Sequence, residues 1–302
     1  MPDNNIQDTF NIRSSLPFIL VFTSCMLVTI SLLPSAAALV KNASPEVNAL
    51  VDKGLSLYHL GNYTQAIQYY DKALSIDPKN VLALGNKGVA LGSLGNDTGA
   101  IQYLDKALAI DPKDVNALTF KGHALDNLGN DTGAIAYFDK ALAIDPKDVN
   151  TLILRGISLY RLGNYTGAIQ YYDKALAIDP ENVRALNFKG DALDRLGNHT
   201  GAIAYYDKVL AIDPENVVAL TFKGDALYSL GNHTGAIQYY DKALAIDPKD
   251  VNALTNKGLA LNSLGKYTEA ISLFDKALAI DPSNVLALKN KGLTVDALNK
   301  TK

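Results

Sequence analysis

The stretch VNTLILRGISLYRLGNYTGAIQYYDKALAIDPEN runs from Val149 to Asn182 and recurs, with substitutions, along most of the chain. Every copy ends in an Asp-Pro pair, and successive prolines stand 34 residues apart without insertions. The seven pairs are Asp77-Pro78, Asp111-Pro112, Asp145-Pro146, Asp179-Pro180, Asp213-Pro214, Asp247-Pro248 and Asp281-Pro282. A fixed period in this range predicts a solenoid, and 34 residues suit a repeat of helix, turn and helix.

Each copy divides into a first helix, A, and a second helix, B. In the first copy, apolar and small residues recur at helical spacing from Leu50 to Leu60. The Gly61-Asn62 pair predicts the end of helix A, and Thr64 is predicted to cap helix B. The Asp-Pro pair then ends helix B, because proline cannot continue a helix. The sequence therefore predicts an all-α fold of antiparallel helix pairs.

Three columns of residues recur at fixed places in the copies. Glycine inside a helix costs about 1 kcal/mol against alanine, so a glycine in every helix A predicts that helix B lies close to it there. A small residue early in helix B and a bulky one four positions later are expected to pack at this contact. The glycines are Gly54, Gly88, Gly122, Gly156, Gly190, Gly224, Gly258 and Gly292. The small residues are Ala66, Ala100, Ala134, Ala168, Ala202, Ala236 and Ala270. The bulky residues are Tyr70, Leu104, Phe138, Tyr172, Tyr206, Tyr240 and Phe274.

These columns resemble those of the tetratricopeptide repeat family in both residue type and spacing. The resemblance implies a right-handed superhelical solenoid, with seven repeats over residues 47–284. Residues 285–302 resemble one more helix A followed by a tail, without a helix B, and such a terminal helix is expected to turn a polar face outward.

A basic residue before each glycine departs from the family pattern, which usually has leucine there. We expect these residues to extend past the helix and pair with nearby aspartates, and a ladder that binds a ligand is the alternative. The column is Lys53, Lys87, Lys121, Arg155, Lys189, Lys223, Lys257 and Lys291.

The N-terminal 38 residues are predicted to be a signal peptide or a membrane anchor. Residues 16–33 carry no charge, and the small residues at 36–38 suit a cleavage site, but the apolar run is long for a signal peptide. Both readings place the repeats outside the cytoplasm. Cys25 also fits a weak lipidation motif. A linker over 39–46 follows, in which Ser44 and Pro45 can start the first helix.

The family resemblance implies a ligand groove on the concave face, lined by the helices A. Residues that vary between the copies fall on this face, although drift on a solvated surface would also vary them. The groove candidates are Tyr58, His59, His123, Asp126, Asn127, Tyr160, Arg161, Asp191, Asp194, Arg195, Asp225, Tyr228 and Asn262. The centre of this set is acidic and aromatic, which favours a basic or sugar-rich partner. The Lys and Asn pair with which chaperone-binding members clamp a carboxylate is absent at the matching positions.

A second set of candidates consists of Asn-x-Thr and Asn-x-Ser sequons, most of them at the turn between helices A and B. With an export signal, they predict a row of N-linked glycans along one edge. Turn and cap chemistry alone would also produce the motif, because asparagine suits the turn and threonine suits a cap. The sequons are at Asn42, Asn62, Asn96, Asn130, Asn164, Asn198, Asn232 and Asn299.

Composition excludes several other functions. A formal net charge of −3, spread evenly, argues against a nucleic-acid ligand. We predict no catalytic residue, no metal site and no cofactor, because no nucleophile stands in a known motif and the histidines lack metal-ligand spacing. The expected function is a protein- or peptide-binding scaffold outside the cytoplasm, with membrane contact only through residues 16–38. The alternative is a structural spacer of a glycosylated cell surface, and the pattern leaves the oligomeric state open.

Overall fold

The computed structural model describes residues 44–301. The predicted signal or anchor, Cys25, Asn42 and most of the predicted linker lie outside this range. The described residues form fifteen helices and no strand, so the all-α prediction is confirmed. None of these helices is both long enough and apolar enough to cross a membrane.

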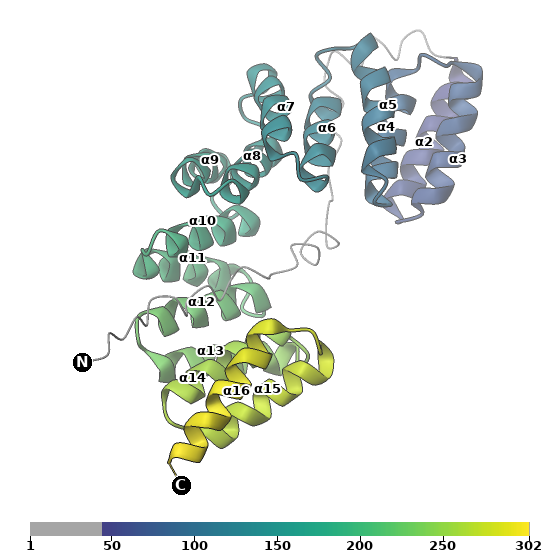
Figure 1. Ribbon diagram of the computed structural model, residues 1–302. Coiled ribbons are helices and arrows are strands. Elements are labelled where there is room, and N and C mark those ends of the chain that lie inside the picture. The colour runs from purple at the N-terminus through teal and green to yellow at the C-terminus, as the bar shows by residue number, and fades with distance from the viewer. Residues whose placement is uncertain (1–43, 302) are drawn as a thin grey trace. The chain divides into compact units, whose positions relative to one another are not determined.

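The helices alternate between the predicted helix A and helix B of each copy (Figure 1). The helices A are α2 (Pro45–His59), α4 (Val81–Ser93), α6 (Val115–Asn127), α8 (Val149–Arg161), α10 (Val183–Arg195), α12 (Val217–Ser229) and α14 (Val251–Ser263). The helices B are α3 (Tyr63–Ile76), α5 (Asp97–Ile110), α7 (Asp131–Ile144), α9 (Tyr165–Ile178), α11 (His199–Ile212), α13 (His233–Ile246) and α15 (Tyr267–Ile280). The last helix is α16 (Val285–Lys300). Helix α2 begins inside the range 39–46 that was predicted as linker, with the Ser44 side chain accepting a hydrogen bond from the Val47 N–H.

The described chain falls into two compact units. Residues 44–247 hold six repeats, in which each helix A packs on its own helix B and each helix B packs on the next helix A. Consecutive helices A also contact one another in this unit, more closely than consecutive helices B do. The helices A therefore form the more closely packed side of this unit. Residues 248–301 hold the seventh repeat, α14 and α15, with α16 packed against α15.

The glycine column is the place where helix A meets helix B. A Cβ atom added to Gly156 would lie 2.4 Å from Cε1 of Tyr172, which is completely buried. A Cβ atom on Gly122 would lie 3.1 Å from the backbone oxygen of Ala134 as well as against the Phe138 ring. The first distance is shorter than essentially any real Cβ contact and the second is tighter than most, so glycine is what lets helix B lie here. The predicted close contact is confirmed.

The turn between helices A and B differs from the prediction in one respect. Gly163 has a φ of 78°, which favours glycine, and the next residue, Asn164, is the N-cap of α9. The Asn164 side chain accepts a hydrogen bond of 2.9 Å from the N–H of Gly167. The prediction that threonine caps helix B was wrong, because Thr64 and its equivalents already lie inside the helix.

The basic column pairs with aspartate, as predicted. Lys121 is buried, and its ammonium group contacts Asp105 on the helix B before it and lies 4.2 Å from the ring centre of Tyr137 on its own helix B. Burial lowers the pKa of Lys121, but hydrogen bonds to Asp105 and Tyr137 outweigh burial and raise the pKa above its usual value. The same aspartate contacts occur at Lys87–Asp71, Arg155–Asp139, Lys189–Asp173, Lys223–Asp207 and Lys291–Asp275. Each of these six basic residues thus links its helix to the helix B of the preceding repeat.

Candidate functional site

Most of the groove candidates lie on the helices A of residues 44–247, and several contact each other from one repeat to the next. The clearest group surrounds Asp126 of α6, which is only 1% exposed. Ser158 of α8 donates a hydrogen bond of 2.8 Å to Asp126. Arg161, also of α8, donates a second bond of 2.8 Å to Asp126, and its Nε lies 3.3 Å from Asp131 of α7. The carboxylate of one repeat therefore holds the arginine of the next.

A second group continues this arrangement into the fifth repeat. The Tyr160 hydroxyl of α8 donates a hydrogen bond of 2.5 Å to Asp191 of α10. Arg195 of α10 donates a bond of 2.9 Å to the Tyr160 oxygen, and its Nε lies 3.8 Å from Asp191. We call these two groups, Asp126, Asp131, Ser158, Tyr160, Arg161, Asp191 and Arg195, the groove network. It connects the helices A of the third, fourth and fifth repeats.

Burial shifts the pKa values of groups in and beside this network. Loss of hydration is the main cause that raises the pKa of Asp126 to about 6; Asp131 adds to the rise, while Ser158 and Arg161 oppose it. Burial also lowers the pKa of His123 to about 4, helped by the positive charges of Arg184 and Arg161. His123 is therefore neutral at pH 7, and part of the Asp126 population is protonated near pH 6.

The remaining candidates on residues 44–247 make fewer of these contacts. The Tyr58 and Ser93 hydroxyls share a hydrogen bond of 3.1 Å between the first two helices A, and the Tyr58 ring packs edge-on against His59. Asn127 donates a bond of 3.0 Å to Asp97, on the preceding helix B. The Tyr228 ring lies 4.9 Å from that of His233. These side chains add aromatic and amide groups to the helix A surface.

The last three groove candidates are Asp225 and Asp194, which bond to a helix B, and Asn262. Asp225 accepts a bond of 2.8 Å from the buried Tyr240 hydroxyl of its own helix B, and Asp194 lies 2.6 Å from Nδ1 of His199. Both bonds therefore join a helix A to the helix B of the same repeat. Asn262 belongs to α14, in the unit of residues 248–301.

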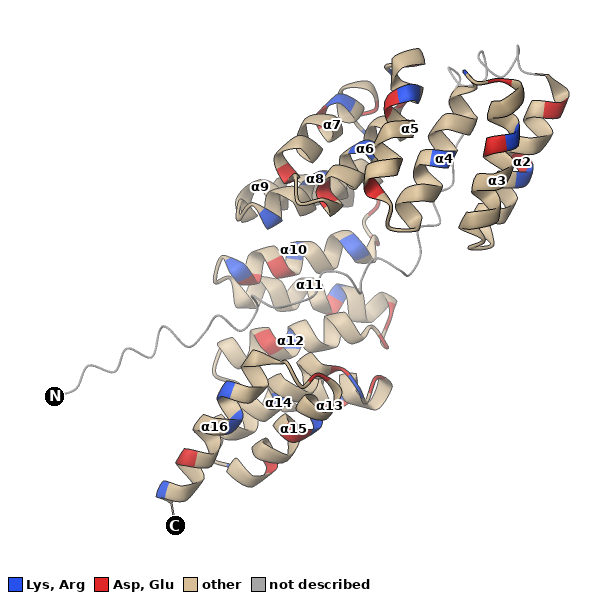
Figure 2. Ribbon diagram, turned by 45° about the vertical axis from the view of Figure 1, so that its right-hand side comes forward, with Lys and Arg blue, Asp and Glu red and all other residues tan. Residues whose placement is uncertain are grey.

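The expectation of an acidic groove surface does not hold. Its four carboxylates are all buried, at 9% exposure or less: Asp126, Asp191, Asp194 and Asp225. The arginine side chains that bind two of them are more exposed, 27% for Arg161 and 23% for Arg195. The surface that a ligand would meet therefore includes the partly exposed Arg161 and Arg195 side chains, whereas the carboxylates are buried. Across the described helices, charges of both signs are scattered, without a long stretch of one sign (Figure 2).

The structure adds residues to the network that the repeat pattern did not single out. Ser158 and Asp131 hold the Asp126 and Arg161 pair, and the Thr119 and Thr151 hydroxyls share a buried bond of 2.6 Å between α6 and α8. Arg184 of α10 donates a bond of 3.4 Å to Asn150 of α8. A signal was present in the sequence, because these helix A partners stand 32 to 35 residues apart, close to one repeat length.

The sequons of the described residues are all exposed. Asn96, Asn130, Asn164, Asn198 and Asn232 each cap a helix B through the side-chain oxygen, which accepts a bond from the glycine N–H three residues later. Asn62, which is followed by Gln65 in place of that glycine, makes no such bond. The cap uses the oxygen of the amide, whereas a glycan would be attached to its nitrogen.

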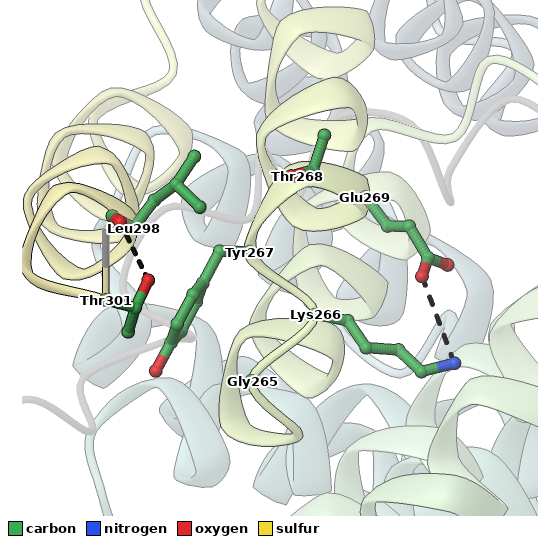
Figure 3. A pocket seen from close by; sticks show the side chains of 7 residues that line it. All are labelled: Gly265, Lys266, Tyr267, Thr268, Glu269, Leu298 and Thr301. Atoms are coloured by element: carbon green, nitrogen blue, oxygen red, sulfur yellow. Dashed lines mark hydrogen bonds and ion pairs between the residues drawn. The ribbon is translucent and has the colours of Figure 1, made fainter.

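A small pocket of about 310 Å³ lies in the unit of residues 248–301, between the start of α15 and the end of α16 (Figure 3). Its walls include Tyr267, Leu298 and Thr301, and a Lys266–Glu269 pair with 4.0 Å between its charged atoms stands at one side. Thr301 donates its hydroxyl hydrogen to the Leu298 carbonyl. The pocket is open and holds no buried charged group, so we assign it no ligand.

The sequence pattern of the tetratricopeptide repeat matches this chain in overlapping segments. The segments are 47–80, 69–102, 95–155, 153–217, 213–251 and 223–285. Together they cover residues 47–285 without a gap, and the structure has the paired helices of such repeats. The fold and the helix A surface define a helical-repeat scaffold for protein interaction. The chain belongs to the tetratricopeptide repeat family. No curated protein sequence matches it.

Solved structures support the same fold at low sequence identity. A tetratricopeptide repeat protein from Parabacteroides merdae is 20% identical, with a TM-score of 0.66, over 83% of this chain and 100% of that one. PilW, described as a type IV pilus biogenesis factor, is 24% identical, with a TM-score of 0.66, over 70% of this chain and 99% of that one. PilF of Pseudomonas aeruginosa is 22% identical, with a TM-score of 0.61, over 70% and 96%. At these identities the likeness concerns the fold alone.

Proposed function

We propose that this chain is a scaffold that binds a protein or peptide partner on the helix A surface of residues 44–247. The observation that carries the proposal is where the copies differ. Helix B keeps nearly the same sequence in every repeat, as DTGAIAYFDKALAI in α7 and HTGAIQYYDKALAI in α13 illustrate. Helix A varies more, as VNTLILRGISLYR in α8 and VRALNFKGDALDR in α10 illustrate. Differences that are more frequent in the helices A than in the helices B favour recognition on the helices A.

The groove network favours a partner that offers hydrogen-bond acceptors, such as an extended peptide with acidic side chains. Arg161 donates a hydrogen bond to Asp126, and Arg195 donates one to the hydroxyl of Tyr160, which in turn donates to Asp191. A guanidinium group fixed in this way loses less side-chain entropy when a ligand binds. Its planar donors also match carboxylate and carbonyl oxygens. The basic or sugar-rich partner that the sequence predicted is the alternative.

The test is to compare capture of native proteins by the full chain and by matched variants. The groove variant carries Arg161→Gln and Arg195→Gln, and the control carries Lys140→Gln and Lys174→Gln on exposed positions of helices B. Circular dichroism establishes that both variants are folded. A protein captured by the unaltered chain and the control, and lost from the groove variant, supports the proposal. Equal capture by all three contradicts it.

We also propose that the repeats act outside the cytoplasm. The proposal rests on the uncharged run of residues 16–33 and the small residues at 36–38, all outside the described range. The intact mass of the mature protein from its native source tests it. Loss of residues 1–38 supports a cleaved signal, and a full-length chain in the membrane fraction supports an anchor. A full-length chain in the soluble cytoplasm contradicts both.

A structural spacer in a glycosylated cell surface is the second candidate function. It is favoured by the exposed sequon asparagines at the same turn of six successive repeats, Asn62 to Asn232. Enzymatic removal of N-linked glycans from native protein, followed by mass measurement, separates the two candidates. A mass decrease equal to several glycans supports the spacer. An unchanged mass leaves cap and turn chemistry as the reason for the motif.

A further inference from the structure

The last helix, α16, exposes an apolar face that contrasts with the polar outer surface expected of a terminal helix. Val285 is 74% exposed, and Leu288 and Leu293 are each 51% exposed. Gly292 lies on the same side of the helix, and a Cβ atom added there would meet nothing within 4 Å. Exposed residues at these spacings form one stripe of a helix. We call Val285, Leu288, Gly292 and Leu293 the α16 face.

The same columns are covered in the complete repeats. The leucine equivalent to Leu288 is at most 4% exposed in six other helices A, namely Leu84, Leu118, Leu152, Leu186, Leu220 and Leu254. In α14, a Cβ atom added to Gly258 would lie 2.7 Å from Cε1 of Phe274. Among the eight described helices A, only α16 leaves both its leucine and its glycine uncovered. The difference is that no described helix B follows α16.

The complete repeats show what covers this face elsewhere. In the fifth repeat, Leu186 of α10 belongs to one apolar cluster with Ala202, Tyr206 and Val209 of α11. The aromatic ring lies over the glycine, since a Cβ atom on Gly190 would be 2.6 Å from Cε1 of Tyr206. A helix that fits the α16 face therefore needs a small residue, an aromatic residue four positions later, and another small or β-branched residue three positions after that.

Lys291 adds a requirement for a second aromatic ring. In the sixth repeat, the ammonium of Lys223 is 4.3 Å from the ring centre of Tyr239, which directly precedes Tyr240 on helix B. The Lys223 side chain is 11% exposed. The Lys291 side chain pairs with Asp275 in the same way but is 38% exposed. A tyrosine next to the first aromatic residue would cover Lys291 through a cation–π contact.

We propose that the α16 face binds an amphipathic helix of another polypeptide with the helix B pattern: small residue, two residues, Tyr, aromatic, two residues, small residue. The A–B interface that occurs seven times in this chain would then occur once more, with the second helix supplied by the partner. This helix-in-groove contact is separate from the helix A surface of residues 44–247 and does not depend on the function proposed there.

The test uses the full chain and a labelled synthetic peptide of residues 231–248, which contains α13. Fluorescence anisotropy measures binding, and the matched control peptide carries Tyr239→Ala and Tyr240→Ala. The protein variants are Leu288→Gln and, as a control of equal 51% exposure at a turn, Leu162→Gln. We expect saturable binding of the peptide to the unaltered chain and to Leu162→Gln. Relative to the unaltered peptide on the unaltered chain, we expect binding of the control peptide to be at least tenfold weaker. We expect the same loss when the unaltered peptide is tested on Leu288→Gln.

Two outcomes would overturn the proposal. Absence of saturable binding, or equal binding by Leu288→Gln, would mean that the α16 face does not take a helix of this type. Sedimentation measures the alternative occupant. A dimer of the unaltered chain that Leu288→Gln dissociates would assign the face to a second copy of the protein. Because both variants change exposed side chains, circular dichroism should show an unchanged fold in each.

Discussion

The Tyr160 hydroxyl in the fourth repeat donates a hydrogen bond of 2.5 Å to Asp191, in helix A of the fifth repeat. Arg195 donates to the same phenol oxygen, so one buried tyrosine joins a carboxylate and a guanidinium group. A buried charge that loses its hydrogen-bond partner costs more than a neutral group does. This contact therefore contributes to the stability of the repeat interface as well as to the groove surface.

Replacing Tyr160 by Phe removes this hydroxyl and keeps the ring. We expect the free energy of unfolding to fall by about 1.5–3 kcal/mol, because Asp191 loses a buried donor. The control is Tyr58→Phe, whose hydroxyl bonds to the exposed Ser93; a loss of less than about 1 kcal/mol is expected there. Urea unfolding followed by circular dichroism measures both. Equal losses would show that burial of the charged partner is not important.

The glycine column predicts opposite effects of one substitution at two equivalent positions. Gly156→Ala places a methyl group against Tyr172, 2.4 Å from its ring, so we expect a loss of about 1–3 kcal/mol of stability. Gly292→Ala places the methyl group in open space. The gain in helix propensity should then stabilise the protein, by up to about 1 kcal/mol. Thermal melts of the two variants check the signs, and a loss for Gly292→Ala would contradict the open α16 face.

Because the pKa of Asp126 is raised in the folded chain, the free energy of unfolding should fall as the pH rises. Burial raises its pKa to about 6 in the folded chain, above the usual value of 3.8. The folded protein therefore binds the proton more tightly than the unfolded chain does, and this contribution to stability is fully present below the unfolded pKa. It is lost as the pH rises from about 4 through about 6.

The measurement is urea unfolding at pH 4.5 and pH 7.5 for the unaltered chain and for Asp126→Asn. The asparagine does not titrate, so the variant should lose less stability over this interval than the unaltered chain, by about 1–2 kcal/mol. The comparison removes the titration of groups that do not interact with Asp126. The same pH dependence in both proteins would refute the assignment of this effect to Asp126.

The N-caps of the helices B give a further matched pair. Asn164 accepts a hydrogen bond from the Gly167 N–H, whereas the side chain of Asn62 makes no cap bond. Asn164→Ala should cost about 1 kcal/mol, and Asn62→Ala should cost clearly less. Chemical denaturation of the two variants measures the difference. If both cost the same, the glycine three residues after the asparagine does not control the cap.

The repeat period predicted the helices, the A–B contact and the basic column, because each depends on spacing within one copy or on the copy next to it. Gly156 meets Tyr172, sixteen residues later, and Lys121 meets Asp105, sixteen residues earlier. Such spacings recur unchanged in every repeat. A single sequence with internal copies therefore carries enough information for the frame of the fold.

The burial of the groove residues could not be predicted from the repeat period. Asp126 and Asp191 are polar and vary between copies, which suggested solvated side chains, yet both are buried. Their burial depends on how closely consecutive helices A approach, and this distance follows from the rotation between repeats rather than from residue spacing. The exposure of Leu288 could not be predicted either, because its column is a core column in six other helices A and no described helix B covers it here.

The most direct test of the proposed groove is site-specific photocrosslinking in the native source. A photoreactive amino acid replaces Asn127, an exposed groove candidate on α6, or Lys140, an exposed residue of the adjacent helix B. The groove proposal predicts that irradiation links a distinct protein to the chain labelled at 127 and does not link it to the chain labelled at 140. Crosslinks to the same proteins from both positions, or from 140 alone, would contradict binding on the helix A surface.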